Sequence, residues 1–203
     1  PIHIHFIGIG GISMSGLAEI LLKEGFTVSG SDTKESPLTK KLVSEGAHII
    51  YGQKAENITR DIGCVVYTAA INRNNPELIE AVALKIPMLT RAELLGQLMK
   101  NYDTPIAVSG THGKTTTSTM TAHLLHQSHV ECTAFLGGIS KNYGTNLLLS
   151  QTSPYTVIEA DEFDRSFHWL SPYMTVITST DPDHLDIYGT EQAYLESFEH
   201  YTT

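Results

Sequence analysis

The stretch from Ser109 to Thr117, which reads SGTHGKTTT, constrains the fold of this chain more than any other feature of its sequence. The apolar run before it, Thr104 to Val108, is typical of a short buried strand, and the apolar spacing from Ser118 to His126 is typical of a helix. A strand, a glycine turn and a helix that opens on Gly-Lys-Thr follow one another in phosphate-binding loops. The sequence therefore predicts an α/β fold in which this stretch binds a nucleoside triphosphate.

The loop is shorter than the general phosphate-loop motif. Val108 stands where the first glycine of the longer motif would be, and only two residues separate Gly110 from Gly113. In either form, N–H groups of the turn and of the helix N-terminus point at the anion. Lys114 would add a positive charge, and the hydroxyl of Thr115 could bind Mg²⁺. Gly-Lys-Thr alone is a weak signal, so a glycine turn before an ordinary helix remains the alternative.

A second glycine turn, Gly8 to Ser13, lies near the N-terminus. It follows a strand-like run from Ile2 to Ile7 and precedes apolar residues at helical spacing from Met14 to Lys23. Asp32 closely follows the next predicted strand, Phe26–Gly30, and lies 22 residues after Gly10. This layout is similar to a dinucleotide-binding fingerprint, although serine replaces the third glycine. We expect the turn to bring backbone N–H groups to a diphosphate, and an NAD-dependent oxidoreductase is one alternative.

Strands and helices alternate along the chain, which predicts a mostly parallel sheet with helices on both faces. The segment 101–105, Asn-Tyr-Asp-Thr-Pro, is the predicted linker. We therefore expect a Rossmann-like first domain over residues 1–103 and part of a phosphate-loop α/β ATPase domain over residues 104–203. The other predicted helices are Leu38–Glu45, Pro76–Leu84, Ala92–Lys100 and Glu191–His200, and the other predicted strands are Phe26–Gly30, Ala47–Tyr51, Cys64–Thr68, Pro87–Leu89, Thr133–Leu136, Tyr155–Ile158 and Met174–Ile177.

The composition argues against several classes of protein. The chain of 203 residues has 13 Lys plus Arg against 22 Asp plus Glu, a net charge of -9, which disfavours nonspecific binding of nucleic acid. No run approaches the ~18 apolar residues of a membrane span, and the N-terminus lacks a signal-peptide pattern, so we expect a cytoplasmic protein without membrane insertion. Cys64 and Cys132 lie in apolar runs and are predicted to be buried thiols. Because the chain begins at Pro1 without Met and ends at Thr203 without a closing element, we expect it to be part of a longer protein.

Four stretches, in order, resemble the Mur ligases, ATP-dependent enzymes that form amide bonds. They are Gly8–Glu19, Gly110–Thr117, Glu159–Glu162 and Asp183–Asp186. The first is similar to the branch of the family that adds L-alanine to UDP-N-acetylmuramate. The resemblance implies a Rossmann-like domain for the UDP-sugar, a central ATPase domain and a closing C-terminal domain. This chain would hold the first and about half of the second, so we expect negligible ATP turnover by this chain alone.

The resemblance implies ligation of L-alanine to UDP-N-acetylmuramate through an acyl phosphate in peptidoglycan synthesis, with ATP and Mg²⁺ as cofactors. A carboxylate is a poor electrophile, so phosphorylation by ATP would create the leaving group that the amine displaces. One alternative is a noncatalytic module that only binds the UDP-sugar. The other is the NAD-dependent oxidoreductase. The sequence predicts no particular oligomeric state.

The resemblance also implies roles for individual residues. The catalytic residues would be Lys114, His112, Glu159 and His184. Thr115 would bind a first Mg²⁺, and Glu159 and His184 would bind a second beside the acyl phosphate. ATP would be bound by Gly110, Thr111, His112, Gly113, Lys114, Thr115 and Thr116. The UDP-sugar would be bound by Gly8, Gly10, Gly11, Ile12, Ser13, Asp32, Thr68, Ala69, Arg91, Gly138, Asn142, Asn146 and Ser166. Mg²⁺ prefers oxygen ligands, so a buried structural histidine remains the alternative for His184. Packing within the loop remains the alternative for His112, and a solvated acid for Glu159.

Overall fold

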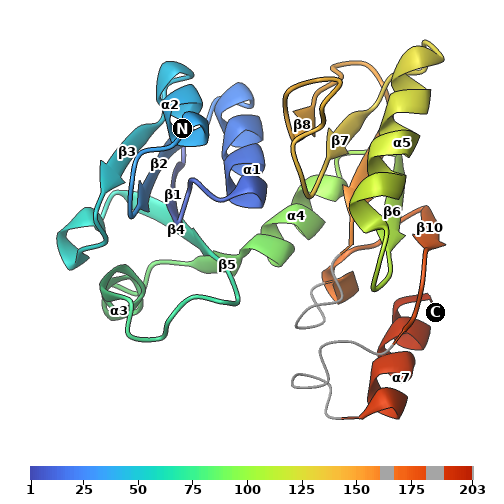
Figure 1. Cartoon of the computed structure of the whole chain (residues 1–203). Helices are drawn as coiled ribbons and strands as arrows, with labels where there is room; N and C mark the ends of the chain where they lie inside the picture. Colours follow the sequence, from blue (N-terminus) through green and yellow to red (C-terminus); the bar gives the residue numbers. More distant parts are fainter. Residues whose placement is uncertain (161–166, 182–189, 203) are drawn as a thin grey trace. The chain divides into compact units, whose positions relative to one another are not determined.

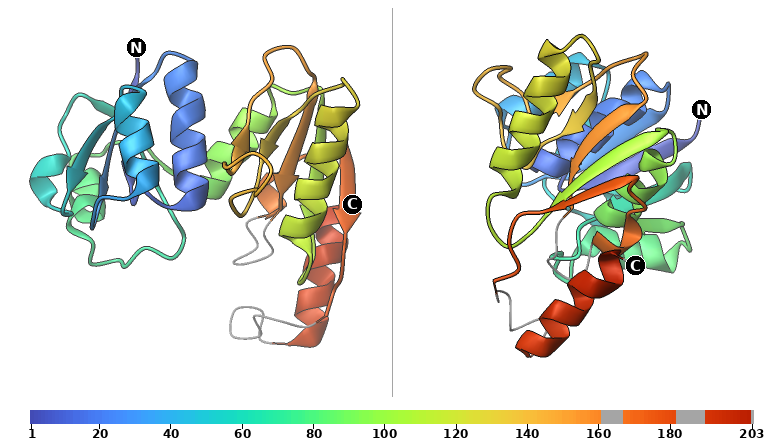
Figure 2. Two further views of the ribbon diagram at one scale, coloured as in Figure 1. Left: turned by 45° about the horizontal axis from the view of Figure 1, so that its top comes forward. Right: turned by 90° about the vertical axis from the view of Figure 1, so that its right-hand side faces the viewer.

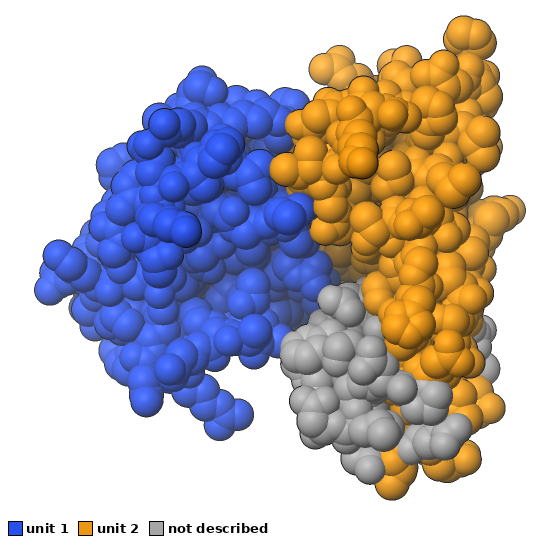
Figure 3. Space-filling view, in the orientation of Figure 1, with its two compact units in different colours: residues 1–94 blue, residues 95–203 orange. Residues whose placement is uncertain are grey.

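The structure is a computed structural model that describes residues 1–160, 167–181 and 190–202 of the chain. It divides into two compact units, Pro1–Leu94 and Leu95–Thr203, which Figure 3 distinguishes by colour. Each unit is a mostly parallel sheet with helices packed on it, so the expected α/β fold is confirmed. No helix within the described ranges has the length and hydropathy that a membrane span requires.

The first unit is built on a parallel sheet of five strands. These are β1 (His3–Ile7), β2 (Thr27–Asp32), β3 (His48–Tyr51), β4 (Ile62–Tyr67) and β5 (Met88–Thr90). They lie in the order β3-β2-β1-β4-β5, so the chain moves outward to β3 and then crosses to the other side of β1. Ligands bind at the carboxyl ends of the strands where the strand order reverses in this way, which here means the ends of β1 and β4.

Side chains cap two of the helices of the first unit. The helices are α1 (Ile12–Lys23), α2 (Pro37–Ser44), the short 3-10 helix η1 (Ala55–Asn57), α3 (Pro76–Ala83) and α4 (Arg91–Met99), which continues into the second unit. The hydroxyl of Ser36 accepts the Thr39 N–H at the start of α2, and the Asn75 side chain caps α3. Figure 1 shows α1 and α2 on one face of the sheet and α3 on the other. Both faces of the parallel strands are therefore covered, as expected.

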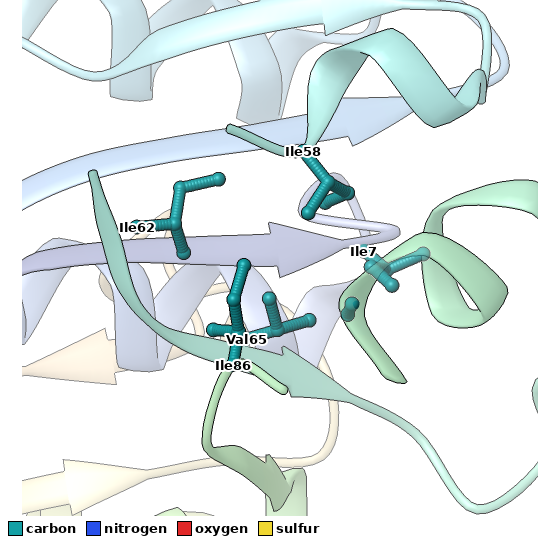
Figure 4. Close-up of a cluster of buried hydrophobic side chains, with 6 residues drawn as sticks. Ile7, Ile58, Ile62, Val65 and Ile86 are labelled. Carbon is teal, nitrogen blue, oxygen red and sulfur yellow. The ribbon is translucent and has the colours of Figure 1, made fainter. Parts of the chain in front are cut away.

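Apolar side chains from the strands and from the α3 region form a core cluster in the first unit (Figure 4). Its buried members are Ile7, Ile58, Ile62, Val65, Ala81 and Ile86. Ile7 is the last residue of β1 and precedes the first glycine turn directly. The cluster therefore fixes the strand end from which that turn departs.

The second unit has a five-stranded sheet in the order β10-β6-β9-β7-β8, with helices α5 and α7. The strands are β6 (Thr104–Ser109), β7 (Thr133–Phe135), β8 (Leu147–Leu148), β9 (Tyr155–Glu159) and β10 (Met174–Ile177), and the helices are α5 (Lys114–Gln127) and α7 (Glu191–Thr202). All neighbouring strands are parallel except β8, which is antiparallel to β7. Two residues are too few to show an alternating pattern, so β8 was not predicted from the sequence. Since β6 pairs with β9, their carboxyl ends lie side by side.

The core of the second unit lies between α5 and the sheet. Ala122 of α5 packs with Cys132, Ala134, Leu136 and Val157 in one buried cluster.

The predicted burial of the cysteines is confirmed for Cys132, and burial raises the pKa of its thiol to about 11. Cys64 is only half-buried, and burial also raises the pKa of that thiol.

Candidate functional sites

The first candidate site is the glycine turn between β1 and α1. The end of the neighbouring strand β2 holds its backbone. The N–H groups of Gly8 and Ile9 both donate to the Ser31 carbonyl oxygen at 2.9 Å. The Gly10 N–H donates to a carboxylate oxygen of Asp32 at 2.8 Å. Three consecutive N–H groups therefore have acceptors within the protein, and the conformation of the turn is set by the protein itself.

The geometry shows what Gly8, Gly10 and Asp32 do within the protein. The N–H groups of the two glycines shape the turn. The other carboxylate oxygen of Asp32 accepts the Thr33 N–H at 2.7 Å, so both oxygens hold backbone. A Cβ at Gly10 would lie 2.6 Å from an Asp32 oxygen, so a larger residue there would push this carboxylate away from the turn.

The groups that face an anion lie at the N-terminus of α1. Gly11 is the N-cap, and its N–H donates to the Gly8 carbonyl oxygen at 3.3 Å. Ile12 and Ser13 lie in the first turn of the helix, at the positive end of its dipole. The guanidinium of Arg91 donates to the Ser13 hydroxyl at 3.0 Å. The structure thus brings Ser13 and Arg91 together and places a positive charge beside the helix N-terminus, an arrangement that suits a phosphate group.

Thr68 and Ala69 directly follow β4, the strand that pairs with β1. Both parallel strands end at the same edge of the sheet. The structure therefore places these two residues at the edge that carries the first glycine turn, next to the point where the strand order reverses.

A buried polar network lies below the first glycine turn, and sequence reasoning missed it. Glu77 is fully buried, and its carboxylate accepts hydrogen bonds from the Ser31 hydroxyl and from the Asn57 amide, the latter at 2.6 Å. The ring of His5 lies 2.8 Å from the Ser29 hydroxyl and 3.6 Å from the Glu77 carboxylate. Ser31 also supplies the carbonyl that holds the turn, so the network continues into the candidate site.

The second candidate site is the loop between β6 and α5. Gly110 and Gly113 have φ angles of 131° and 82°, in the left-handed region that favours glycine. Gly113 is the N-cap of α5, and Thr115 and Thr116 lie in the first helical turn. Lys114 folds back so that its ammonium donates to the Gly110 carbonyl at 2.7 Å. The charges expected at a phosphate-binding loop are therefore gathered at one helix N-terminus.

The segment that follows β10 braces this loop. The Thr111 N–H donates to the Ser179 carbonyl, and the His112 N–H donates to the Ser179 hydroxyl, both at 3.1 Å. The Thr178 hydroxyl donates to the His112 carbonyl, and a Cβ at Gly110 would collide with that hydroxyl. Sequence reasoning gave Ser179 no firm role. Its contact with the loop depends on the pairing of β10 with β6.

Glu159, the last residue of β9, faces the start of α5. Its carboxylate accepts hydrogen bonds from the Thr115 hydroxyl at 3.1 Å, the Ser118 hydroxyl at 3.0 Å and the Gly137 N–H at 2.7 Å. Hydroxyl and carboxylate oxygens are the ligands that Mg²⁺ prefers, so the Thr115–Glu159 pair fits a magnesium ion. Within the described ranges, no three His, Cys, Asp or Glu residues form a metal-binding group. The predicted site residues Ser166 and His184 lie outside the described residues.

Three residues expected at the UDP-sugar lie between β7 and β8. Gly138 is next to the phosphate loop, since a Cβ there would be 3.4 Å from the methyl group of Thr115. Asn142 is exposed. Asn146 is buried, and its backbone carbonyl oxygen accepts the Leu136 N–H at 2.8 Å. The structure therefore brings Gly138 to the phosphate loop and places Asn142 at the surface.

These features define a class of protein: an α/β nucleotide-binding protein with a Rossmann-like glycine turn in one unit and a phosphate loop with an acidic partner in the other. Family comparisons agree with both halves. Residues 3–103 match the family model described as "Mur ligase family, catalytic domain", and residues 108–201 match "Mur ligase middle domain". The chain belongs to the Mur ligase family.

Individual relatives extend the match over the whole chain. The UDP-N-acetylmuramate--L-alanine ligase of Phocaeicola vulgatus is 58% identical and covers 98% of this chain and 44% of its own length. The protein of the same name from Agathobacter rectalis is 53% identical, with coverages of 100% and 44%. This chain thus spans less than half the length of these curated relatives.

Solved structures agree with the fold. The UDP-N-acetylmuramate-alanine ligase MurC of Thermotoga maritima is 34% identical with a TM-score of 0.90, over 100% of this chain and 47% of that chain. The UDP-N-acetylmuramate:L-alanyl-gamma-D-glutamyl-meso-diaminopimelate ligase of Neisseria meningitides is 31% identical with a TM-score of 0.90, over 98% of this chain and 67% of that chain.

Gly10→Ala should lower the free energy of unfolding, because the new methyl group would lie 2.6 Å from an Asp32 oxygen and 2.9 Å from the Thr39 side chain. Overpacking of this kind costs about 1–3 kcal/mol. Gly11→Ala is the matched control, since its nearest neighbour would be 3.6 Å away. We expect the control to cost less than about 0.5 kcal/mol. Urea unfolding of the two variants measures the difference, and equal costs would contradict the close packing of the turn against β2.

Proposed function

We propose that this chain forms the UDP-sugar-binding and ATP-binding parts of a ligase that joins L-alanine to UDP-N-acetylmuramate through an acyl phosphate in peptidoglycan synthesis. The observation that carries the proposal is the phosphate loop at the start of α5, with the Glu159 carboxylate 3.1 Å from the Thr115 hydroxyl. The names of the relatives from P. vulgatus and A. rectalis support the choice of substrates. Because the chain spans 44% of their length, the complete reaction is proposed for a protein that includes this chain.

The proposed reaction has to make a carboxylate reactive toward an amine. ATP, with Mg²⁺, would supply a phosphoryl group to the muramoyl carboxylate, and the amine of L-alanine would then displace phosphate. The protein's share is to position the reacting groups and to neutralise charge. The N–H groups at the start of α5 and the ammonium of Lys114 meet that need, since they present positive charge to phosphate oxygens.

The position of Lys114 supports this proposed role. Its ammonium donates to the Gly110 carbonyl at 2.7 Å, so it lies over the backbone that would hold the phosphates. If the Lys114 ammonium left the neutral Gly110 carbonyl for a charged phosphate oxygen, the new hydrogen bond would be charge-assisted and therefore stronger. Gly110, Thr111, Gly113 and Thr116 are proposed to complete the binding of ATP through the loop backbone and the first turn of α5.

Thr115 and Glu159 are the proposed Mg²⁺ ligands within the described residues, with His184 as a further ligand. A hydroxyl oxygen keeps lone pairs while it donates a hydrogen bond. Thr115 can therefore bind a cation and still donate to Glu159. His112 follows Thr111 in the loop, and we assign it a contact with the transferred phosphoryl group.

The UDP-sugar is proposed to bind to the first unit, with its diphosphate at the N-terminus of α1. Ser13 and Arg91 lie 3.0 Å apart there and offer a hydroxyl and a positive charge. Gly11 and Ile12, at the start of α1, would lie beside the diphosphate, while Thr68 and Ala69 would line the same edge. The proposed contacts to the muramoyl group are Gly138, Asn142, Asn146 and Ser166. A cytoplasmic location is part of the proposal.

UDP-N-acetylmuramate should bind this chain in a calorimetric titration, and NADH should not. A dehydrogenase with one dinucleotide site would not need a second glycine loop, whereas the proposed ligase uses the loop at the start of α5 for ATP. Arg91→Ala should weaken binding of the UDP-sugar about tenfold, the effect of losing one charged hydrogen bond. Binding of NADH but not of the UDP-sugar would contradict the proposal and favour an NAD-dependent oxidoreductase.

Lys114→Ala should weaken binding of a magnesium complex of a nonhydrolysable ATP analogue by about tenfold to a hundredfold, because a charged hydrogen bond to phosphate is lost. Lys100→Ala is the control, since Lys100 is an exposed lysine of the same unit outside the loop. Titration of both variants by calorimetry gives the two affinities. Unchanged affinity in Lys114→Ala would show that the loop does not bind the triphosphate through this lysine.

A further inference from the structure

A buried tyrosine of α7 contacts the phosphate loop. Tyr194 is fully buried, and its hydroxyl oxygen lies 2.7 Å from the hydroxyl oxygen of Thr111. Thr111 donates in turn to the Asp181 carbonyl at 2.7 Å. A carbonyl can only accept, so the proton of the Thr111 hydroxyl is engaged there. The Tyr194 hydroxyl is therefore the donor to Thr111.

Aromatic packing fixes the position of the Tyr194 ring. Residues of α7 at helical spacing turn the same face inward, and the Phe198 ring lies 5.2 Å from the rings of both Tyr194 and Phe167. The Tyr201 ring lies 4.6 Å from that of Phe167. The His168 ring adds a hydrogen bond to the Ser197 carbonyl at 3.0 Å, so α7 is anchored at several points. The hydroxyl of Tyr194 is thus held at a fixed place.

Thr111 connects this hydroxyl to the backbone of the loop. Its N–H donates to the Ser179 carbonyl at 3.1 Å, while its side chain bonds to Asp181 and Tyr194. Both ends of the residue are therefore restrained. The next residue, His112, is held through its own N–H by the Ser179 hydroxyl. A restraint on Thr111 consequently limits the freedom of the whole turn that ends at Gly113.

The geometry points to Tyr194 as a positioning residue of the phosphate loop. Its hydroxyl restrains Thr111 and thereby keeps the loop backbone ordered for a phosphate-containing ligand. The ligand part of this assignment rests on the proposed function, in which the loop binds a triphosphate. A phenylalanine would fill the same space in the aromatic cluster, so packing alone does not require the hydroxyl. A loop ordered before binding loses less entropy when the ligand arrives, which raises affinity.

The test compares Tyr194→Phe with Tyr201→Phe in the full chain. Both variants remove one hydroxyl from α7. Within the described part of the chain Tyr201 packs on Phe167, and no hydrogen bond joins its hydroxyl to the phosphate loop. Amide hydrogen exchange of residues 110–113 without nucleotide is the first readout. Affinity for a magnesium complex of a nonhydrolysable ATP analogue is the second. Urea unfolding of each variant reports global stability separately.

We expect Tyr194→Phe to speed exchange of the loop amides and to weaken nucleotide affinity, each about fivefold, which is the effect of one net hydrogen bond. Tyr201→Phe should change neither. Thr111→Val removes the contact with Tyr194 and also the hydrogen bond to the Asp181 carbonyl, so its effect should be at least as large as that of Tyr194→Phe. The double variant of Thr111→Val with Tyr194→Phe should be no worse than Thr111→Val alone.

Unchanged loop exchange in Tyr194→Phe would overturn the assignment, whatever happens to global stability. The exchange readout needs no nucleotide. If the wild-type chain fails to bind the ATP analogue, the proposed function is in error, but faster loop exchange in Tyr194→Phe alone would still support a positioning role for Tyr194.

Discussion

The carboxylate of Glu159 holds three segments of the second unit together around the phosphate loop. It lies at the end of β9 and accepts three hydrogen bonds, two from hydroxyl groups of α5 and one from the Gly137 N–H. One acid thereby connects a strand, the helix that follows the phosphate loop and the segment after β7. Parallel pairing makes this possible, because Val108 of β6 stands opposite Glu159 in the register. The same bonds orient the Thr115 hydroxyl, which is the group proposed to meet the magnesium ion.

Both glycine turns meet one physical requirement. A turn that presents N–H groups to an anion stays ordered only if its remaining polar groups have partners within the protein. In the first unit the partners come from the end of β2, through Ser31 and Asp32. In the second they come from the residues after β10, through Thr178 and Ser179. In each case the partner strand lies directly beside the strand that feeds the turn, so sheet order decides which residues can act.

The sequence was enough to predict the elements and the residues of the phosphate loop. Apolar spacing located nearly every strand and helix, and the Gly-Lys-Thr triplet located Lys114 and Thr115. The distance of Asp32 from the first glycine turn identified it as part of that site, but its role as a brace appears only once β2 lies beside β1. The contacts of Glu77, Ser179 and Tyr194 could not be predicted, because they depend on which distant elements pack together. Their residue types alone are typical of a helix start, a polar turn and a buried aromatic core.

A crystal structure of the chain with Mg²⁺ and a nonhydrolysable ATP analogue tests the central claim most directly. The account predicts that the terminal phosphates lie on the N–H groups at the start of α5, that Lys114 leaves the Gly110 carbonyl for a phosphate oxygen, and that the Thr115 hydroxyl binds the metal at about 2.1 Å. A triphosphate bound away from this loop, or a metal that does not touch Thr115, would contradict it.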